Sequence, residues 1–560
     1  MKTQDPHHAC GTPTLPGAKW ITPSAQAGPD ARQGRYGLHI EEPVVDTVTP
    51  THRPNILLIT SDQHRGDAYG FEGSTVRTPH LDLLAGQGTR FSACITPNVV
   101  CQPARASLLT GLLPLTHGVH DNGIDLDEDI ADRGFAGTLG RAGYSTAFIG
   151  KAHFSTYFTH EPTTRPENVA GSALYGDNWN GPYMGFDRVE MTLMGHNYWL
   201  PERPPRGRSY ERWYHADGLG DLKDELYKRR GGDDGGAAQT HHSVLPPAWH
   251  NSSWIGDRTV EFLRDHKRGG AKPFCAWVSF PDPHHPFDAP LPWSLLHPPE
   301  SIRLPAHRTL DFDKRPWWHR AASESSPAIS GEMKRVRQEY SRIAPQSDQQ
   351  LRHLIANYYG MISLIDHNVG RILSVLDELD LSRDTIVIFT SDHGEWLGDH
   401  GLVLKGPMFY EGLLRVGLLM RGPGIPAGKV VQDPVSTLDL AATIGDYSGT
   451  PIAAASHSAS LRPLLDGTGR RSHAYGEWQL GPNRCGVALD LRVARTGSAK
   501  LTLELGSGAG ELYLLDQDPH EMENRYDDPA CRGIREELTD MIRSRPQDIR
   551  DPLPQPIGSA

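Results

Sequence analysis

Two short apolar runs, far apart in the chain, share one pattern. Residues 55–60 (NILLIT) and 385–390 (TIVIFT) are rich in aliphatic and β-branched side chains and contain no charged residue. Such runs are typical of strands that are buried on both faces of a sheet. We therefore predict that both segments are central strands.

The two runs also end alike, in SDQH and SDHG, so that Asp62 and Gln63 follow the first and Asp392 and His393 follow the second. In open α/β sheets, ligands bind at the carboxyl ends of the strands. Each strand thus delivers a carboxylate and a second side chain of ligand type to the edge where a site is expected.

Further strands are predicted at 145–149, 274–280 and 417–420, and a long helix with apolar positions at helical spacing at 351–379. Another helix is expected to start at Thr78-Pro79 and to end near Gly86 to Gly88. Alternating strands and helices predict an α/β fold, with a large mixed sheet sandwiched by helices.

The texture of the chain divides it into regions. Residues 1–50 lack periodicity and are predicted to form an extended or disordered arm. The main α/β domain is assigned to 51–465, with charged, Pro- and Gly-rich loops or insertions near 200–250 and 295–345. A smaller C-terminal α+β domain is predicted at 466–548, with strand-like pieces at 491–497 and 500–505. A tail follows at 549–560.

Composition narrows the function. The net charge of −12 gives no general electrostatic attraction for nucleic acid, so an anionic ligand needs local cations or a metal. No CxxC pair occurs among the six scattered cysteines, which favours neither a zinc ribbon nor a disulfide framework and suits a reducing compartment. No signal peptide and no apolar stretch of about 18 residues is visible, so we expect a cytoplasmic protein without a membrane partner.

The most informative segment is CQPARASLLTG at 101–111. Pro103 suits the first turn of a helix, and Gly111 ends it. Cys101 then lies at a helix N-terminus with Arg105 one turn further on, an environment that lowers a thiol pKa and stabilises an anionic adduct. A buried cysteine before an ordinary helix would show the same pattern.

This segment, with THG at 116–118, resembles the C-x-P-x-R signature of the type I sulfatases, although Ala104 stands where many members have Ser. The resemblance covers roughly residues 52–545 and implies the fold of the alkaline phosphatase superfamily. It implies that Cys101 is oxidised by a formylglycine-generating enzyme to formylglycine, whose hydrate is the nucleophile. Five further elements match in order: Asp62-Gln63, Lys151-Ala152-His153, Pro283-His284-His285-Pro286-Phe287, Asp392-His393-Gly394 and Lys405.

The resemblance also implies one divalent metal ion, with ligands Asp62, Gln63, the modified Cys101, Asp392 and His393. Oxygen-rich ligation favours Ca²⁺ or Mg²⁺, and one imidazole makes Mn²⁺ credible. Many sulfatases carry Asp and Asn where this chain has Gln63 and His393, which leaves the metal open; the family favours Ca²⁺.

The implied reaction is hydrolysis of a sulfate ester through a covalent sulfo-enzyme intermediate. Arg105 and Lys151 would hold the formylglycine hydroxyls, and His284 or Lys405 would protonate the departing alcohol. His153 would deprotonate the remaining hydroxyl so that sulfate is expelled.

Several alternatives stay open beside this assignment. His285 competes with His284, and Asn122 either contacts substrate or shapes a turn before Gly123. Phosphonate monoester or phosphodiester hydrolysis with the same nucleophile, and a non-catalytic binding protein with unmodified Cys101, are the rival functions. The aromatic residues of the 176–216 region either stack on a sugar or aryl ring of the substrate or pack the insertion; they are Trp179, Tyr183, Tyr198, Trp199, Tyr210, Trp213 and Tyr214. The particular sulfate ester and the oligomeric state are not predicted.

Overall fold

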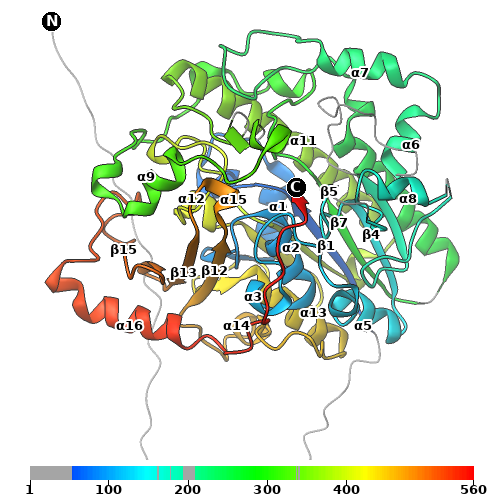
Figure 1. Cartoon of the computed structure of the whole chain (residues 1–560). Coiled ribbons are helices and arrows are strands. Elements are labelled where there is room, and N and C mark those ends of the chain that lie inside the picture. The colour runs from blue at the N-terminus through cyan, green and yellow to red at the C-terminus, as the bar shows by residue number, and fades with distance from the viewer. Residues whose placement is uncertain are drawn as a thin grey trace, which may run out of the picture. The chain divides into compact units, whose positions relative to one another are not determined.

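An eight-stranded mixed sheet, in the order β10-β2-β9-β8-β1-β7-β4-β6, forms the centre of the protein in this computed structural model (Figure 1). Five neighbouring strands run parallel: β8 (Thr385–Ser391), β1 (Asn55–Ser61), β7 (Phe274–Ser279), β4 (Ser145–Lys151) and β6 (Arg188–Thr192). The remaining three are β9 (Leu418–Arg421), antiparallel to β8, β2 (Thr89–Phe91) and β10 (Lys429–Val431). The predicted α/β class is confirmed, and the two apolar runs are adjacent central strands.

The structure describes residues 53–559 except 160–162, 177, 193–208, 271, 336 and 339–340. The arm predicted at 1–50 lies outside these residues, as do Tyr198 and Trp199.

Helices cover both faces of the sheet because the central strands are apolar on both sides. In β1, Ile56 and Leu58 join one buried cluster, while Leu57 and Ile59 join another on the opposite face. The first face is covered by α2 (Cys101–Thr110), α5 (Phe135–Arg141) and α13 (Leu440–Ser448). The second is covered by α1 (Pro79–Gln87), α8 (Asn251–Gly269) and α11 (Asp348–Glu378).

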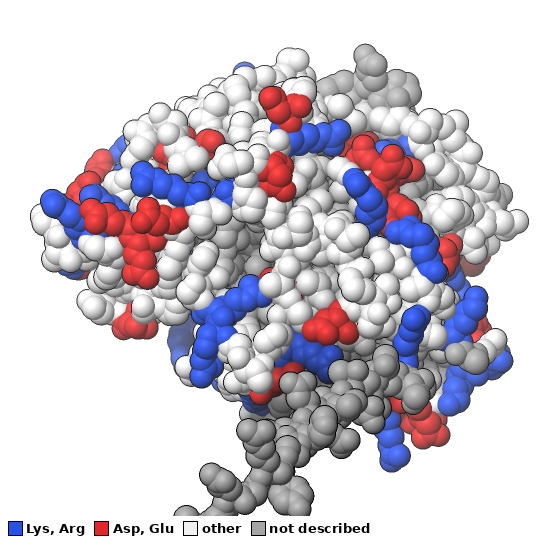
Figure 2. All heavy atoms as spheres, turned by 90° about the horizontal axis from the view of Figure 1, so that it is seen from below, with Lys and Arg blue, Asp and Glu red and all other residues white. Residues whose placement is uncertain are grey.

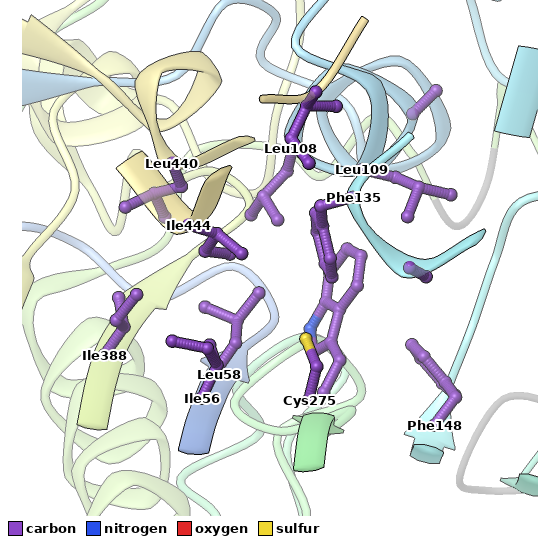
Figure 3. Packing of buried hydrophobic residues seen from close by; sticks show 14 of the residues in the cluster. Ile56, Leu58, Leu108, Leu109, Phe135, Phe148, Cys275, Ile388, Leu440 and Ile444 are labelled. Atoms are coloured by element: carbon purple, nitrogen blue, oxygen red, sulfur yellow. The ribbon is translucent and has the colours of Figure 1, made fainter. Parts of the chain in front are cut away.

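Two leucines of helix α2 anchor it to the hydrophobic core. Leu108 and Leu109 point toward the cluster formed by β1, β8 and α5 (Figure 3). The helix ends where Gly111 takes a left-handed conformation (φ 70°) and its N–H bonds to Ser107 O, a common C-terminal cap. The preceding Val100 is extended, so the first residue of the helix is Cys101.

The C-terminal part contains a separate antiparallel sheet. Its strands are β12 (Ala474–Leu480), β13 (Leu489–Arg495), β14 (Ala499–Glu504) and β15 (Gly510–Leu514). Helix α16 (Arg532–Arg543) packs Leu538 and Ile542 on this sheet. The α+β character agrees with the predicted texture, and the domain boundaries at residues 465 and 548 stay predictions.

The charged segments expected to be long loops are partly helical. Residues 209–250 include α6 (Ser209–His215) and α7 (Gly220–Lys228), and the second segment includes α9 (Trp317–Glu324) and α10 (Gly331–Arg335). Their Gly and Pro residues lie between these short helices, so composition averaged over fifty residues concealed them.

The predicted tail is also held in place. Strand β16 (Gly558–Ser559) pairs antiparallel with β5 (Phe158–Thr159), and Arg550 N donates to Leu115 O, 2.9 Å away. Figure 1 shows this red segment running along α2 and α3 (Pro114–His117) toward β5.

The surface carries both signs of charge. On the face in Figure 2, Lys and Arg alternate with Asp and Glu instead of gathering into one basic field. Within the described part of the chain, no helix is both long and apolar enough to cross a bilayer. Five cysteines, Cys94, Cys101, Cys275, Cys485 and Cys531, are buried free thiols.

Candidate active site

The carboxyl ends of the central strands bring the predicted residues together. Ser61 and Ser391 are register partners at the ends of β1 and β8, so Asp62 and Asp392 leave the sheet side by side. Lys151 is the last residue of β4, which runs parallel to β7. The site therefore lies at the sheet edge that the two similar runs predict.

Cys101 lies at the centre of this group and is only 1% exposed. Its Sγ is 3.0 Å from Lys405 Nζ, 3.2 Å from His393 Nε2 and 3.7 Å from Asp62 Oδ1. Burial and the Asp62 carboxylate raise the pKa of the thiol, but the charges of Lys405 and other nearby cations outweigh them and leave the pKa below its ordinary value.

Two buried cations hold the two carboxylates. Arg105 Nε donates to Asp392 Oδ2 at 2.8 Å, and its Nη2 lies 3.4 Å from Asp62 Oδ2. Lys151 Nζ is 2.5 Å from the same Asp62 oxygen. Burial works to raise the pKa of Asp62, but Lys151, His284 and Arg105 hold it well below its usual range. Asp62 is thus held as an anion among buried cations, and Arg105 pairs with Asp392 as well.

The same residues fit a divalent cation. Asp62, Cys101, Asp392 and His393 offer ligand atoms that all lie within 4.8 Å of one another. His393 Nδ1 bonds to Gly394 O at 2.8 Å, which leaves Nε2 as a lone-pair donor facing Cys101. In formylglycine, hydrate oxygens would stand where Cys101 Sγ stands here.

Gln63 could supply a further ligand atom. Its Oε1 is buried and has no hydrogen-bond partner in the described structure, which is costly unless a cation or water faces it. Its Nε2 instead contacts Glu395 Oε2 and lies 3.3 Å from His285 Nδ1. The backbone of Gln63 is left-handed (φ 66°), a strained conformation that clusters at functional sites. This donor set, with two carboxylates, an amide oxygen and one imidazole, suits Ca²⁺, Mg²⁺ or Mn²⁺.

Lys405 joins the nucleophile position to the predicted acid. Its Nζ is 3.0 Å from His284 Nε2 as well as 3.0 Å from Cys101 Sγ. His284 Nδ1 donates to His285 O at 2.6 Å, so its Nε2 accepts from Lys405. Burial and the neighbouring Lys405 charge keep the pKa of His284 well below its ordinary value. Since His285 Nδ1 instead faces Gln63, His284 is the histidine that contacts Lys405.

His153 follows β4 and is buried. Its ring stacks on Tyr157 with centroids 4.4 Å apart, its backbone φ is 55°, and both ring nitrogens are buried without a hydrogen-bond partner in the described chain. Burial and the charges of Lys151 and Arg105 hold its pKa well below the ordinary value. A neutral imidazole with free nitrogens is suited to accept a proton.

Asn122 is less clearly part of the site. Its Oδ1 accepts from Gln102 N at 3.0 Å, so the side chain caps the start of α2. Contact with a substrate stays a prediction. Two histidines near Asn122 in sequence have local partners: His117 contacts Ser107, and His120 contacts two carbonyls, those of Gln479 and Pro554.

Three of the aromatic residues of the 176–216 region are buried in the core. Tyr183 belongs to one buried cluster of the sheet, and Tyr210 and Tyr214 belong to the other. Glu395 and Tyr157, by contrast, were not singled out from the sequence. The acidic residue three positions after Asp392 was the one available signal, and it indicates no partner by itself.

Comparison with known proteins gives the geometry a family context. The family described as Sulfatase matches residues 54–450, and the family described as N-sulphoglucosamine sulphohydrolase, C-terminal, matches residues 398–548. An arylsulfatase of Clostridium perfringens is 27% identical over 84% of this chain and 90% of its own length. A choline-sulfatase of Rhizobium meliloti is 27% identical over 87% of this chain and 85% of its own. Among solved structures, a phosphonate monoester hydrolase of Agrobacterium radiobacter is 26% identical, with a TM-score of 0.69, over 88% of this chain and 95% of that one.

Proposed function

The chain belongs to the sulfatase family of the alkaline phosphatase superfamily, and from this premise we propose that it hydrolyses sulfate monoesters with a formylglycine nucleophile made from Cys101. One observation carries the proposal. The Sγ of Cys101, at the N-terminus of α2, lies within 3.7 Å of Asp62, His393 and Lys405 at the meeting point of two strand ends. A formylglycine-generating enzyme is the partner that maturation would require.

The charge of the site fits a sulfate ester. The transferring group is an anion that repels nucleophiles, so cations must surround it before attack is feasible. Arg105 and Lys151 are fixed by Asp62 and Asp392, and Lys405 reaches the position of the nucleophile from the opposite loop. These three cations would hold the sulfuryl oxygens and stabilise charge as the ester bond breaks.

A divalent cation would be held by Asp62, Gln63, Asp392 and His393 together with the modified residue 101. When bound, it would supply Lewis acidity beside the reacting oxygen atoms. Ca²⁺ is the ion that we propose, because the donors are mostly hard oxygens.

Proton transfer would use two separate groups. Lys405, which donates to His284 Nε2, would supply the proton that the departing alcohol needs, and His284 would relay or replace it. His153, neutral and with free ring nitrogens, would accept a proton during the release of sulfate. The covalent sulfo-enzyme intermediate and the cytoplasmic location stay predictions.

Phosphonate monoester hydrolysis is the second candidate, favoured by the similarity to the phosphonate monoester hydrolase of Agrobacterium radiobacter. The same cations and metal ligands would bind a phosphonate ester, since both substrates present tetrahedral anionic oxygens.

The test is a substrate panel on protein whose aldehyde content at residue 101 has been verified. Aryl sulfates, sulfated sugars, choline sulfate and aryl phosphonate monoesters are compared by kcat/KM, with Cys101→Ala as the blank. We expect a sulfate ester to have the highest kcat/KM. A higher value for the phosphonate monoesters would assign the second function, and inactivity toward the whole panel would overturn the reaction class.

A further inference from the structure

Glu395 is a fully buried carboxylate (0% exposed) that contacts both a predicted metal ligand and the loop before Lys405. Its Oε2 accepts from Gln63 Nε2, and its Oε1 accepts from the N–H groups of Leu397 and Leu404. We propose that Glu395 is a positioning residue: it holds the Gln63 amide with its oxygen toward the metal position and fixes the loop that delivers Lys405. The inference rests on the metal site of the proposed function.

The partners of the Gln63 side-chain amide determine its orientation. The NH₂ group of Gln63 meets two acceptors, Glu395 Oε2 and His285 Nδ1, whereas its Oε1 meets no donor in the described chain. Rotating the amide by half a turn would press its oxygen against the Glu395 carboxylate and put its N–H groups where the unpartnered Oε1 now lies. Glu395 therefore selects the rotamer in which a lone pair faces the cation.

Glu395 also holds the loop from Trp396 to Leu404. Leu397 (φ 52°) and Leu404 (φ 72°) both have left-handed backbones, which non-glycine residues rarely adopt. Both of their N–H groups donate to Glu395 Oε1, and Trp396 N donates to Leu404 O at 3.1 Å. The residue after Leu404 is Lys405, so one carboxylate sets both a metal ligand and the cation beside Cys101.

A carboxylate is required because every group that reaches Glu395 here is a donor. Three N–H groups converge on two acceptor oxygens. A glutamine at position 395 has one acceptor oxygen and one NH₂, so it can satisfy Gln63 or the loop but not both. If its oxygen serves the loop, its NH₂ faces the NH₂ of Gln63 and forces that amide to turn its oxygen away from the metal.

This conflict can be reversed by exchanging the two side-chain types. In the double variant Gln63→Glu/Glu395→Gln, the new carboxylate at 63 accepts from the new amide at 395 and still presents an oxygen to the metal. The loop N–H groups keep the amide oxygen of residue 395. The donors and acceptors are paired again when His285 carries its proton on Nδ1, so that both side-chain hydrogen bonds of residue 63, to residue 395 and to His285, are inverted.

The experiment measures the Kd of Mn²⁺ by the EPR signal of free ion, and of Ca²⁺ by calorimetry, on the full chain with unmodified Cys101. Loss of an outer partner of a metal ligand typically weakens binding about 10–100-fold, and we expect this for Glu395→Gln. We expect the Kd of the double variant for each metal ion to lie within a few-fold of the value for the original sequence. Glu477→Gln, which removes another fully buried carboxylate away from the site, is the matched control and should leave the Kd unchanged.

Because Gln63→Glu adds a charge that attracts cations anywhere, it is also measured alone. Coupling requires that Gln63→Glu improves affinity much more in the Glu395→Gln background than in the original chain. Equal improvement in both backgrounds, or an unchanged Kd in folded Glu395→Gln, would overturn the inference. If Glu395→Gln does not fold, Glu395→Asp, which keeps both acceptors but retracts them, should weaken binding in a folded protein; an unchanged Kd there would also overturn it.

These measurements separate the inference from the proposed function, because none of them requires turnover. Coupled metal binding in a protein that cleaves no sulfate ester would refute the function and leave the inference intact. A chain that hydrolyses sulfate esters without binding Mn²⁺ or Ca²⁺ would refute the inference and the metal site on which it rests, and leave the reaction class intact.

Discussion

The ends of β1 and β8 are alike in sequence and different in how they hold their second ligand. After β8, the His393 ring is oriented by the next residue, because Nδ1 bonds to Gly394 O. After β1, Gln63 needs a left-handed backbone and a partner, Glu395, that is 332 positions away in the chain. One strand end is locally complete, and the other is completed by the tertiary fold.

The orientation of one ligand-type side chain is therefore set by neighbouring residues in the sequence, and that of the other by tertiary contacts. A histidine followed by glycine can be read as a ligand from its neighbours alone. A glutamine amide has two chemically opposite ends, so its role depends on which end the surroundings pair. The comparison predicts that substitutions near β8 act directly on ligand chemistry, whereas substitutions near β1 act through partners.

The largest effect on activity is expected at Cys101, where the ends of β1 and β8 converge. Cys101→Ala should lower kcat/KM by at least roughly 10⁴-fold, as for loss of other nucleophiles, because no carbonyl can form there. The side chain is small and buried, so the Tm should change little. Turnover of a sulfate ester with release of inorganic sulfate measures the effect, and near-normal turnover in the variant would refute the nucleophile assignment.

The next largest effects are expected from removing either carboxylate, and the two variants should differ in stability. Asp62→Asn and Asp392→Asn should each lower kcat/KM on the order of 10³-fold or more, since each removes an anionic metal ligand. Asp62→Asn should also cost more stability, about 3–5 kcal/mol, because it leaves the buried Lys151 ammonium without its carboxylate.

Asp392→Asn should cost less, because Arg105 keeps Asp62 and the new amide oxygen can still accept from Gln63 N and His393 N. Chemical denaturation of both variants in the presence of a chelator measures the difference. Greater destabilisation by Asp392→Asn would contradict the assigned charge pairing.

His153, which follows a third strand, β4, is not among the predicted metal ligands, and its ring nitrogens have no hydrogen-bond partner in the described chain. His153→Ala should lower kcat about 10²–10⁴-fold, the range for loss of a general base, while the Kd of Mn²⁺ stays within about twofold. Tyr157→Phe keeps the stacked ring and should have a much smaller effect on kcat. A large loss of metal affinity in His153→Ala would move this residue into the ligand set.

The smallest effect concerns the equivalent serines of the two ends. Ser391 Oγ accepts from His64 N at 3.0 Å and contacts Ser61 O at the same distance, whereas Ser61 Oγ has only longer contacts, with His64 Nδ1 at 3.2 Å and Thr390 O at 3.5 Å. Ser391→Ala should cost about 1–3 kcal/mol because it strands a buried N–H, and Ser61→Ala about 1 kcal/mol or less. Urea denaturation gives both values, and the reverse order would show that the two ends are not held as described.

The sequence predicted most of this region because its signals are local. The strands at 55–61 and 385–391 were evident from their apolar runs, and the ligands followed directly at their ends. Lys151 and His153 were assigned from the resemblance to the type I sulfatases, in an element that follows the strand predicted at 145–149.

Features that depend on distant contacts were missed. Glu395 is defined by Gln63 and by two loop N–H groups, none of which is visible as a pattern. The first strand of the C-terminal sheet, AYGEWQL, was missed because Gly476 and the buried Glu477 interrupt its apolar alternation. Asn122 fitted both a substrate contact and a turn before Gly123, whereas the fold places its oxygen on Gln102 N.

The central claim is that residue 101, where the two strand ends meet, acts as an aldehyde and not as a thiol. Mass spectrometry of the peptide that contains residue 101, taken from the protein of its native host while it hydrolyses a sulfate ester, tests this most directly. The account predicts a peptide in which the sulfur and two hydrogens of Cys101 have been replaced by one oxygen. An intact thiol throughout an actively hydrolysing preparation would contradict it.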